Sequence, residues 1–289
     1  MMTGLLIFAR RSTRTVLRFA LLLAVMLCFP GNPLAAYAGE VIRVGGTGCA
    51  LGGMKEAAHV FRKKRPDVTF SFVPSLGSSG GIKAVLSGAL DLSLSSRPIT
   101  DEERKQGASQ AEYARTPFIF VTSHKGKTGD VTLDLLVSIY AGETKTWPDG
   151  VPLRLIMRPA GDADMVYLKT LSPAMDKAVA AALKREGMVM AVTDQENADA
   201  IERIRGGFGA FTLAQLLAEQ RPLTPLRLNG TTPSLAALSN GSYPYYKTFY
   251  AVTVSRPNQG VQAFIKFLNS PEGRRVLKET GHLAPRSPQ

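Results

Sequence analysis

Two strand-like segments that lie far apart in the chain constrain its fold more than any other feature. Residues 116–122 read TPFIFVT and residues 246–254 read YKTFYAVTV, and both are rich in the side chains that favour strands. Alternating helical and strand-like patterns fill the interval between them, at residues 131–140, 151–158, 173–186, 194–205 and 208–212. We therefore expect an inserted α/β segment that two crossings join to the rest of the chain.

The chain before the first crossing alternates in the same way. Strand-like and helical patterns follow one another at residues 41–44, 55–64, 68–73, 82–90 and 92–94, and residues 260–280 predict two further helices. Such alternation is typical of a mostly parallel sheet with helices on both faces. The fold class is therefore α/β with two lobes, each a mixed, mostly parallel sheet flanked by helices, joined by two hinge crossings. Lobe 1 would comprise residues 39–122 and 246–289, and lobe 2 residues 123–245.

The N-terminus has the pattern of a signal peptide. Four arginines without an acidic partner precede the apolar run FALLLAVMLCF at residues 19–29. This run is short for a membrane span, and Ala36-Tyr37-Ala38 supplies the small residues that signal peptidase accepts. We expect cleavage after Ala38 and export to the periplasm. The alternative is an uncleaved N-terminal anchor.

Composition limits the function classes. Loss of residues 1–38 would lower the formal charge from +12 to +8, because it removes four arginines and no acidic residue. The basic residues are interleaved with acidic ones and lack the aromatic pattern of a single-strand binder, so we expect no nucleic-acid partner. Cys49 would then be the only cysteine, which excludes an internal disulfide. The three histidines are isolated from one another in sequence, so we expect neither a metal nor another cofactor.

The most informative segment is GSSGGIK, at residues 77–83, which follows a predicted strand and opens a predicted helix. A helix N-terminus carries unpaired N–H groups and a partial positive charge, and small residues let an anion approach them. Serine hydroxyls add further donors. The segment therefore indicates an anion site, although serine and glycine are also common in an ordinary N-cap turn without a ligand.

The same residues satisfy the pattern G-x-S-x-G, which permits a serine hydrolase with Ser79 as the nucleophile and His282 as its base. Only about one βα unit precedes Ser79 after residue 38, which leaves little room for the earlier strands and the oxyanion loop of such enzymes. We therefore do not expect an enzyme.

The segment 77–83 is similar to the phosphate loop of the periplasmic phosphate-binding proteins of ABC transporters, which belong to a broader class of two-lobed solute receptors. The resemblance spans nearly all of the chain after residue 38 and implies the periplasmic-binding-protein fold. It also implies ligand contacts for residues in both lobes. These are Ser78, Ser79 and Gly80 in the loop, Ser96 and Arg97 in the segment SSRP, the backbone N–H groups of Ala50 and Leu51, and Arg158 as a clamp from lobe 2.

Two departures from the family pattern concern the choice of anion. Many relatives have an aspartate at the position of Ser96, where it accepts the proton of hydrogen phosphate. After Arg158, relatives have a G-S-G-T-like turn, whereas this chain has Gly161-Asp162-Ala163-Asp164. Carboxylates close to a bound dianion would repel it, so we expect these aspartates to cap a helix with their side chains turned away.

The resemblance implies a receptor that reversibly binds phosphate or a related tetrahedral oxyanion in the cleft between the lobes. Such a receptor would deliver its ligand to an ABC permease in the inner membrane, and we expect it to be a monomer. The alternative is a sensory receptor that reports a solute to a membrane partner without transport.

Overall fold

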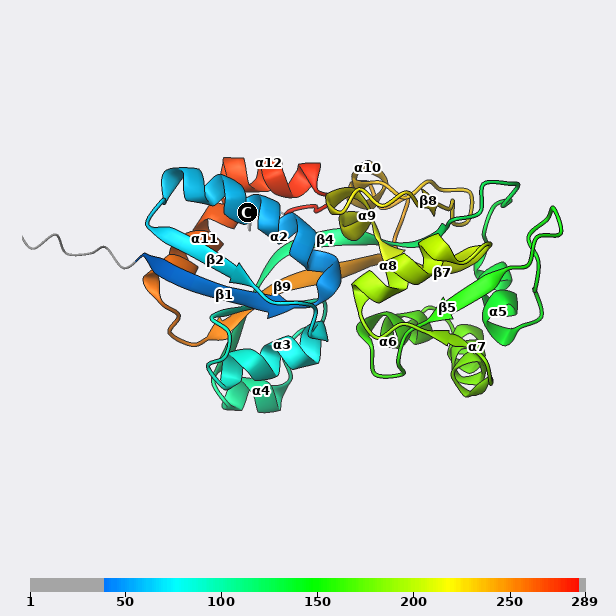
Figure 1. The fold of residues 1–289 in the computed structure, drawn as a ribbon, viewed down its shortest axis with the longest axis horizontal. Helices are drawn as coiled ribbons and strands as arrows, with labels where there is room; N and C mark the ends of the chain where they lie inside the picture. The colour runs from blue at the N-terminus through cyan, green and yellow to red at the C-terminus, as the bar shows by residue number, and fades with distance from the viewer. Residues whose placement is uncertain (1–38, 286–289) are drawn as a thin grey trace, which may run out of the picture. The chain divides into compact units, whose positions relative to one another are not determined.

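The computed structural model describes residues 39–285, so the predicted signal peptide, residues 1–38 with cleavage after Ala38, lies outside the described residues. The described chain forms two α/β lobes that share two long strands (Figure 1). This architecture confirms the predicted fold class. Within residues 39–285, no helix is both long enough and apolar enough to cross a membrane.

Lobe 1 is built on three parallel strands near the N-terminus, with α11 and α12 added from the end of the chain. Its elements are β1 (Glu40–Gly46), α2 (Gly48–Lys64), β2 (Val68–Phe72), α3 (Gly77–Leu86), β3 (Leu92–Ser95), α4 (Asp101–Lys105), α11 (Gln259–Leu268) and α12 (Pro271–Glu279). β1 lies between β2 and β3 and pairs in parallel with both. Parallel pairing places the carboxyl ends of these strands at one edge of the sheet, where the glycine-serine loop follows β2.

Lobe 2 repeats the same kind of architecture. Its elements are α5 (Leu133–Ala141), β5 (Arg154–Met157), α6 (Ala163–Thr170), α7 (Pro173–Lys184), β6 (Val189–Met190), α8 (Asp194–Arg203), β7 (Gly207–Thr212), α9 (Leu213–Ala218), β8 (Thr224–Pro225) and α10 (Leu235–Ser239). β5 pairs in parallel with β6 and β7. The helices begin where the sequence offers caps. The hydroxyls of Thr132, Ser172 and Thr193, for example, accept N–H groups at the starts of α5, α7 and α8.

Two antiparallel strands, β4 (Ala108–Thr122) and β9 (Tyr246–Val254), pass between the lobes. The first part of β4 pairs with β9, and its last residues, 118–122, pair with β7. The sheet therefore runs through both lobes in the order β2-β1-β3-β9-β4-β7-β5-β6, and β8 pairs with β4. β9 has the predicted bounds. β4 begins eight residues before its predicted start, because pairing with β9 makes a strand of a segment whose polar residues obscure the strand pattern.

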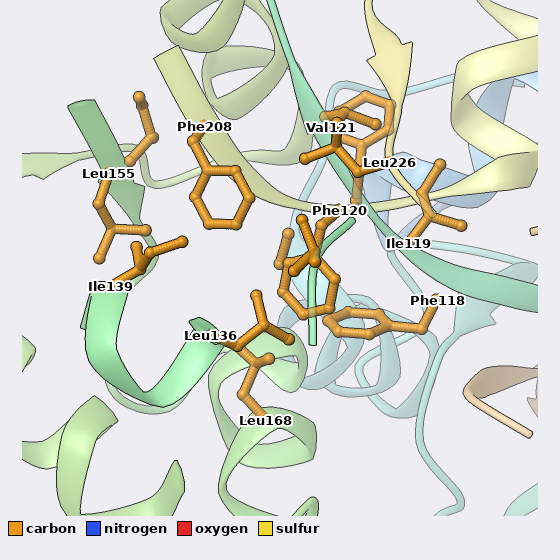
Figure 2. Packing of buried hydrophobic residues seen from close by; sticks show 14 of the residues in the cluster. Phe118, Ile119, Phe120, Val121, Leu136, Ile139, Leu155, Leu168, Phe208 and Leu226 are labelled. Carbon is orange, nitrogen blue, oxygen red and sulfur yellow. The ribbon is translucent and has the colours of Figure 1, made fainter. Parts of the chain in front are cut away.

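The lobes have separate hydrophobic cores. In lobe 1, the ring of Phe61 packs edge-on against Phe264, with 5.3 Å between centroids. In lobe 2, the ring of Phe120 stacks on Phe208 at 5.8 Å (Figure 2). The two clusters separate within β4, and Ala214 of α9 is the one buried residue between β4 and β9 that belongs to the lobe 1 cluster. The domain boundaries at residues 122 and 245 stay a prediction.

His282, just after α12, is buried in lobe 1 beside Thr280, and burial lowers the pKa of its ring to about 4 from an ordinary value of 6.5. As the pH falls, the ring of His282 is protonated in the unfolded chain before it is protonated in the folded chain. The folded state therefore loses stability between about pH 6.5 and about pH 4. We expect His282 to contribute on the order of 3 kcal/mol to this loss. Urea unfolding of wild type and His282→Gln at both pH values should show a shallower pH dependence for the variant.

The exposed His59 of α2 provides a matched control, because His59→Gln makes the same chemical change without removing a buried ring. This control should unfold with the pH dependence of the wild type. An equal pH dependence for wild type and His282→Gln would contradict the prediction.

Candidate functional site

The N-terminus of α3 is the feature that most favours anion binding. α3 begins at Gly77, five residues before the predicted start, so the whole glycine-serine loop forms its first turn. Gly77 has a φ of +65°, a backbone conformation that glycine adopts at little cost and that turns the chain from β2 into the helix. No side chain caps this end of α3, and its first turn contains no acidic residue. Its first N–H groups are therefore available to an anionic ligand.

Serine hydroxyls join this helix to the loop after β3. The backbone N–H of Ser96 donates to Ser78 Oγ at 3.0 Å, and the two hydroxyl oxygens lie 3.1 Å apart. Ser78 is buried, whereas Ser79 is exposed. The structure thus brings Ser78, Ser79, Gly80 and Ser96 together, as the resemblance implied, and all four line one cleft.

Arg97 lies beside these serines, but an acidic residue balances its charge. Its guanidinium donates to Ser79 Oγ at 3.0 Å and pairs with Glu103 at 2.7 Å. The hydrogen bonds from Arg97 hold the pKa of Glu103 down to about 2, below its ordinary value. Arg97 lines the cleft and orients the Ser79 hydroxyl. Because Glu103 pairs with it, the net positive charge that Arg97 contributes to the cleft is small.

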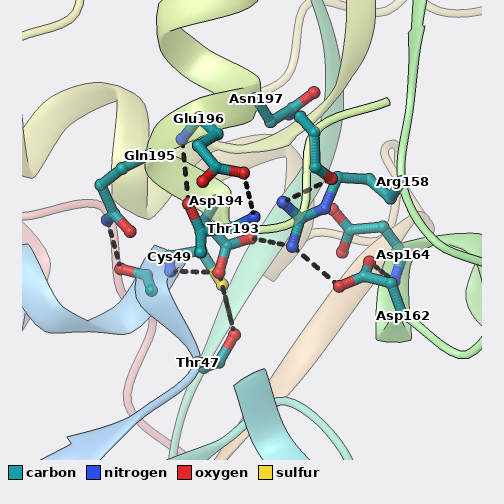
Figure 3. Close-up of polar contacts among 12 residues, drawn as sticks. Thr47, Cys49, Arg158, Asp162, Asp164, Thr193, Asp194, Gln195, Glu196 and Asn197 are labelled. Carbon is teal, nitrogen blue, oxygen red and sulfur yellow. Dashed lines mark hydrogen bonds and ion pairs between the residues drawn. The ribbon is translucent and has the colours of Figure 1, made fainter. Parts of the chain in front are cut away.

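Arg158 does not line the cleft. It is buried behind two carboxylates of lobe 2, at 2.8 Å from Asp162 and 3.5 Å from Asp194 (Figure 3). Burial alone would lower the pKa of Arg158, but Asp194 and Asp162 raise it above its ordinary value. Its Nε has no hydrogen-bond partner among the described residues. Arg158 therefore neutralises the carboxylates that line the cleft, and its direct contact with a ligand stays a prediction.

The expectation that both aspartates of the GDAD turn point away from the cleft is wrong for Asp162. Asp162 caps α6 as expected, since its Oδ1 accepts the N–H of Asp164 at 2.8 Å, but its side chain also lines the cleft. Pairing with Arg158 explains this position, because a hydrogen bond to a buried guanidinium stabilises a carboxylate more than exposure to solvent does. Asp164 is turned inward and is buried.

The N-terminus of α2 already holds a carboxylate. Asp194 Oδ2, from the first turn of α8, accepts the N–H of Cys49 at 3.0 Å, and Gln195 Nε2 donates to the carbonyl of Gly48 at 3.2 Å (Figure 3). Ala50 and Leu51 lie in this first turn, are buried and do not line the cleft with the serines. The Ala50 N–H donates to Thr47 O at 3.3 Å. Ligand contacts from Ala50 and Leu51 stay a prediction.

A buried ion pair joins a crossing strand to lobe 2. Lys247 of β9 contacts the carboxylate of Asp164, and both side chains are almost fully buried. Burial would lower the pKa of Lys247, but Asp164 raises it above its ordinary value. Burial also raises the pKa of the Asp164 carboxyl, which Lys247 opposes. The pair fixes the start of α6, and therefore Asp162, relative to β9.

Our sequence reasoning missed Lys247 and Asp194. A lysine as the only charged residue of the run YKTFYAVTV was a signal for Lys247, because inward-facing positions of a strand carry a charge only when it is paired. Asp194 gave no such signal, since an acidic residue in the first turn of a helix is common.

These residues surround a cleft of about 470 Å³ between the lobes. Lobe 1 contributes the serines, Arg97 and the first turn of α3, and lobe 2 contributes Asp162, Asp194 and the start of α6. A neighbouring hollow of about 770 Å³ shares Ser75 and Thr193 with the cleft and is lined by Leu51. Three glutamates, Glu196, Glu202 and Glu219, also line this hollow and outnumber its two cations, Lys55 and Arg221, which makes it the less favourable place for an anion.

Ser79 and His282 do not form the catalytic pair that the hydrolase alternative requires. Ser79 Oγ accepts from Arg97, which is not a base, and His282 contacts Thr280 in the interior of lobe 1. Among residues 39–285, no group of three or more His, Cys, Asp and Glu side chains is placed to hold a metal ion.

Comparisons with known proteins agree with this architecture. A family model described as the PBP superfamily domain matches residues 33–272. A phosphate-binding protein PstS of Borreliella burgdorferi is 26% identical over 220 residues, which cover 72% of this chain and 77% of that protein. One of Staphylococcus saprophyticus is 27% identical over 236 residues, covering 74% and 71% of the two chains.

The fold also matches solved structures. A putative phosphate ABC transporter substrate-binding protein of Clostridium perfringens, solved with bound phosphate, superposes with a TM-score of 0.73 at 20% identity. The superposition covers 86% of this chain and all of that one. At this identity the likeness concerns the two-lobed fold, and the named relatives are binding proteins and not enzymes, in agreement with our expectation.

Proposed function

Because the chain belongs to the family described as the PBP superfamily domain, we propose that it is an extracytoplasmic solute receptor for phosphate or a related tetrahedral oxyanion, which it delivers to an ABC importer. The observation that carries this proposal is the uncapped N-terminus of α3, which opens into the interlobe cleft beside the hydroxyls of Ser78, Ser79 and Ser96. The names of the relatives from Borreliella and Staphylococcus support the choice of phosphate.

The anion would bind to lobe 1 first. The N–H groups of Ser79 and Gly80 and the nearby hydroxyls act as donors, and the partial positive charge of the helix end adds to their attraction. Fixed dipoles of this kind bind an anion without a mobile proton. Arg97 positions the Ser79 hydroxyl, so that its hydrogen points away from the guanidinium and toward the ligand.

Arg158 of lobe 2 and Lys247 of the crossing strand β9 would contribute by offsetting the negative charges of Asp162, Asp164 and Asp194. A rotation of the lobes about β4 and β9 then encloses the ligand and excludes water, and the closed form is what a permease recognises. The receptor acts in the periplasm as a monomer after loss of residues 1–38. No bond of the ligand is made or broken.

Calorimetric titration of the chain without residues 1–38 tests this proposal directly. We expect saturable one-to-one binding of an oxyanion when phosphate, sulfate, molybdate and several amino acids are compared. Saturable binding of amino acids alone would contradict the oxyanion assignment.

The contribution of Arg158 can be tested in the same assay. Arg158→Ala leaves Asp162 and Asp194 without their shared cation, so we expect it to abolish phosphate binding. Arg158→Lys keeps a positive charge there and should retain part of the affinity. Circular dichroism should establish that both variants are folded. Unchanged phosphate binding by a folded Arg158→Ala would contradict the proposed role.

A further inference from the structure

The helix N-terminus and the serine hydroxyls that favour an anion lie on one side of the cleft. Lobe 1 offers the N-terminus of α3 and three serine hydroxyls. The facing wall carries Asp162 and Asp194 with Arg158 buried behind them, the hydroxyl groups of Tyr167 and Thr193, and Lys247, which is paired with Asp164. The start of α6 provides no free donor at Asp164, because Asp162 accepts its N–H. A bare oxyanion carries oxygens on every side, so some of those directed toward lobe 2 would lie near the carboxylates of Asp162 and Asp194.

Apolar side chains complete the same wall. Only seven large hydrophobic residues in the described part of the chain are exposed, and three of them line this cleft. They are Leu76, 45% exposed, from lobe 1, and Val166 and Val192, 52% and 66% exposed, from lobe 2. Exposed apolar side chains that gather in one cleft mark a surface that is covered in the functional state.

The size of the cleft leads to the same conclusion. Its volume of about 470 Å³ falls within the range of sites that hold organic molecules. The polar groups that could orient a ligand are gathered at the α3 end, and the remaining lining includes Pro159, Val166, Tyr167 and Val192. The cleft therefore offers an apolar surface around Val166 and Val192 in addition to its polar groups.

We propose that the ligand is a tetrahedral phosphorus oxyanion that carries one small apolar substituent, such as a phosphonate or a phosphate monoester. This inference rests on the proposed function and names the ligand class of the same site. The oxyanion binds at the N-terminus of α3, and the substituent lies against Val166 and Val192. No oxygen of the ligand is then directed at the carboxylates of lobe 2.

Titration of the chain with inorganic phosphate, methylphosphonate and propylphosphonate tests this assignment. We expect propylphosphonate to bind at least about tenfold more tightly than phosphate, because each methylene group that leaves water contributes favourably. The double variant Val166→Ser, Val192→Ser should bind propylphosphonate at least about tenfold more weakly and phosphate with almost unchanged affinity. Val254→Ser, at an exposed valine outside the cleft, is the matched control and should behave as the wild type in both titrations.

Phosphate that binds as tightly as propylphosphonate would overturn this inference and leave the proposed function intact. The exposed apolar side chains would then serve as contacts between the closed lobes. If neither phosphate nor either phosphonate binds, the proposed function fails and this inference fails with it. Equal losses of both ligands in the double variant would also contradict the inference, because its effect would then not depend on the substituent.

Discussion

Replacement of Ser79 by aspartate is expected to weaken phosphate binding at least about a hundredfold without lowering the stability of the protein. Ser79 lies in the first turn of α3, where a carboxylate interacts favourably with the helix dipole and can pair with Arg97. The same carboxylate would repel a bound anion, by about 4 kcal/mol for unit charges 4 Å apart at an effective dielectric constant of 20. Calorimetric titration and thermal unfolding measure the two effects separately.

Two controls separate charge from shape. Ser79→Asn changes the size of the side chain without adding a charge and should cost about tenfold in affinity or less. Ser87→Asp adds the same charge to the exposed C-terminal cap of α3 and should leave binding almost unchanged. If Ser79→Asp binds phosphate as tightly as Ser87→Asp does, the anion does not bind at the start of α3.

The second large effect concerns stability. Lys247→Met should lower the free energy of unfolding by about 3–5 kcal/mol, because it leaves the buried carboxylate of Asp164 without its partner. Burial of an unpaired charge costs desolvation free energy, whereas in the wild type the attraction between Lys247 and Asp164 offsets that cost. Denaturant unfolding at neutral pH measures the loss.

The double variant Lys247→Met, Asp164→Asn is the rescue experiment. It removes both charges and should recover most of the lost stability. The exposed pair between Lys105 and Glu102 provides a matched control, since Lys105→Met should cost at most about 1 kcal/mol. A loss for Lys247→Met no greater than that for Lys105→Met would contradict the assignment of a buried ion pair.

The fold was largely predictable because its periodic patterns are local. The strand at Tyr246–Val254 has its predicted bounds, since alternation and β-branched side chains mark it along its whole length. The start of β4 was not predictable in this way. Gln110 and Glu112 interrupt its pattern, although pairing with β9 makes this segment a strand. The pairing with β9 thus determines the secondary structure of this segment, which local sequence propensity leaves ambiguous.

Only the part of the site formed by consecutive residues, at the start of α3, was predictable from the sequence. Ser78, Ser79 and Gly80 lie in the first turn of one helix, so their neighbours in space are also their neighbours in sequence. The contact between Asp194 and Cys49 joins residues 145 positions apart, and no local pattern specifies it. The burial of Arg158 likewise depends on two carboxylates brought together by α6 and α8. Sequence reasoning identified this arginine but not the groups that cover it.

The central claim is that an oxyanion binds at the N-terminus of α3, and a crystal structure with arsenate tests it most directly, because anomalous scattering locates the arsenic atom. We expect a single arsenate in the cleft, with its oxygens about 3 Å from the N–H nitrogens of Ser79 and Gly80. Arsenic at the start of α2, in the hollow beside Leu51, or absent from the cleft at saturating arsenate would contradict it.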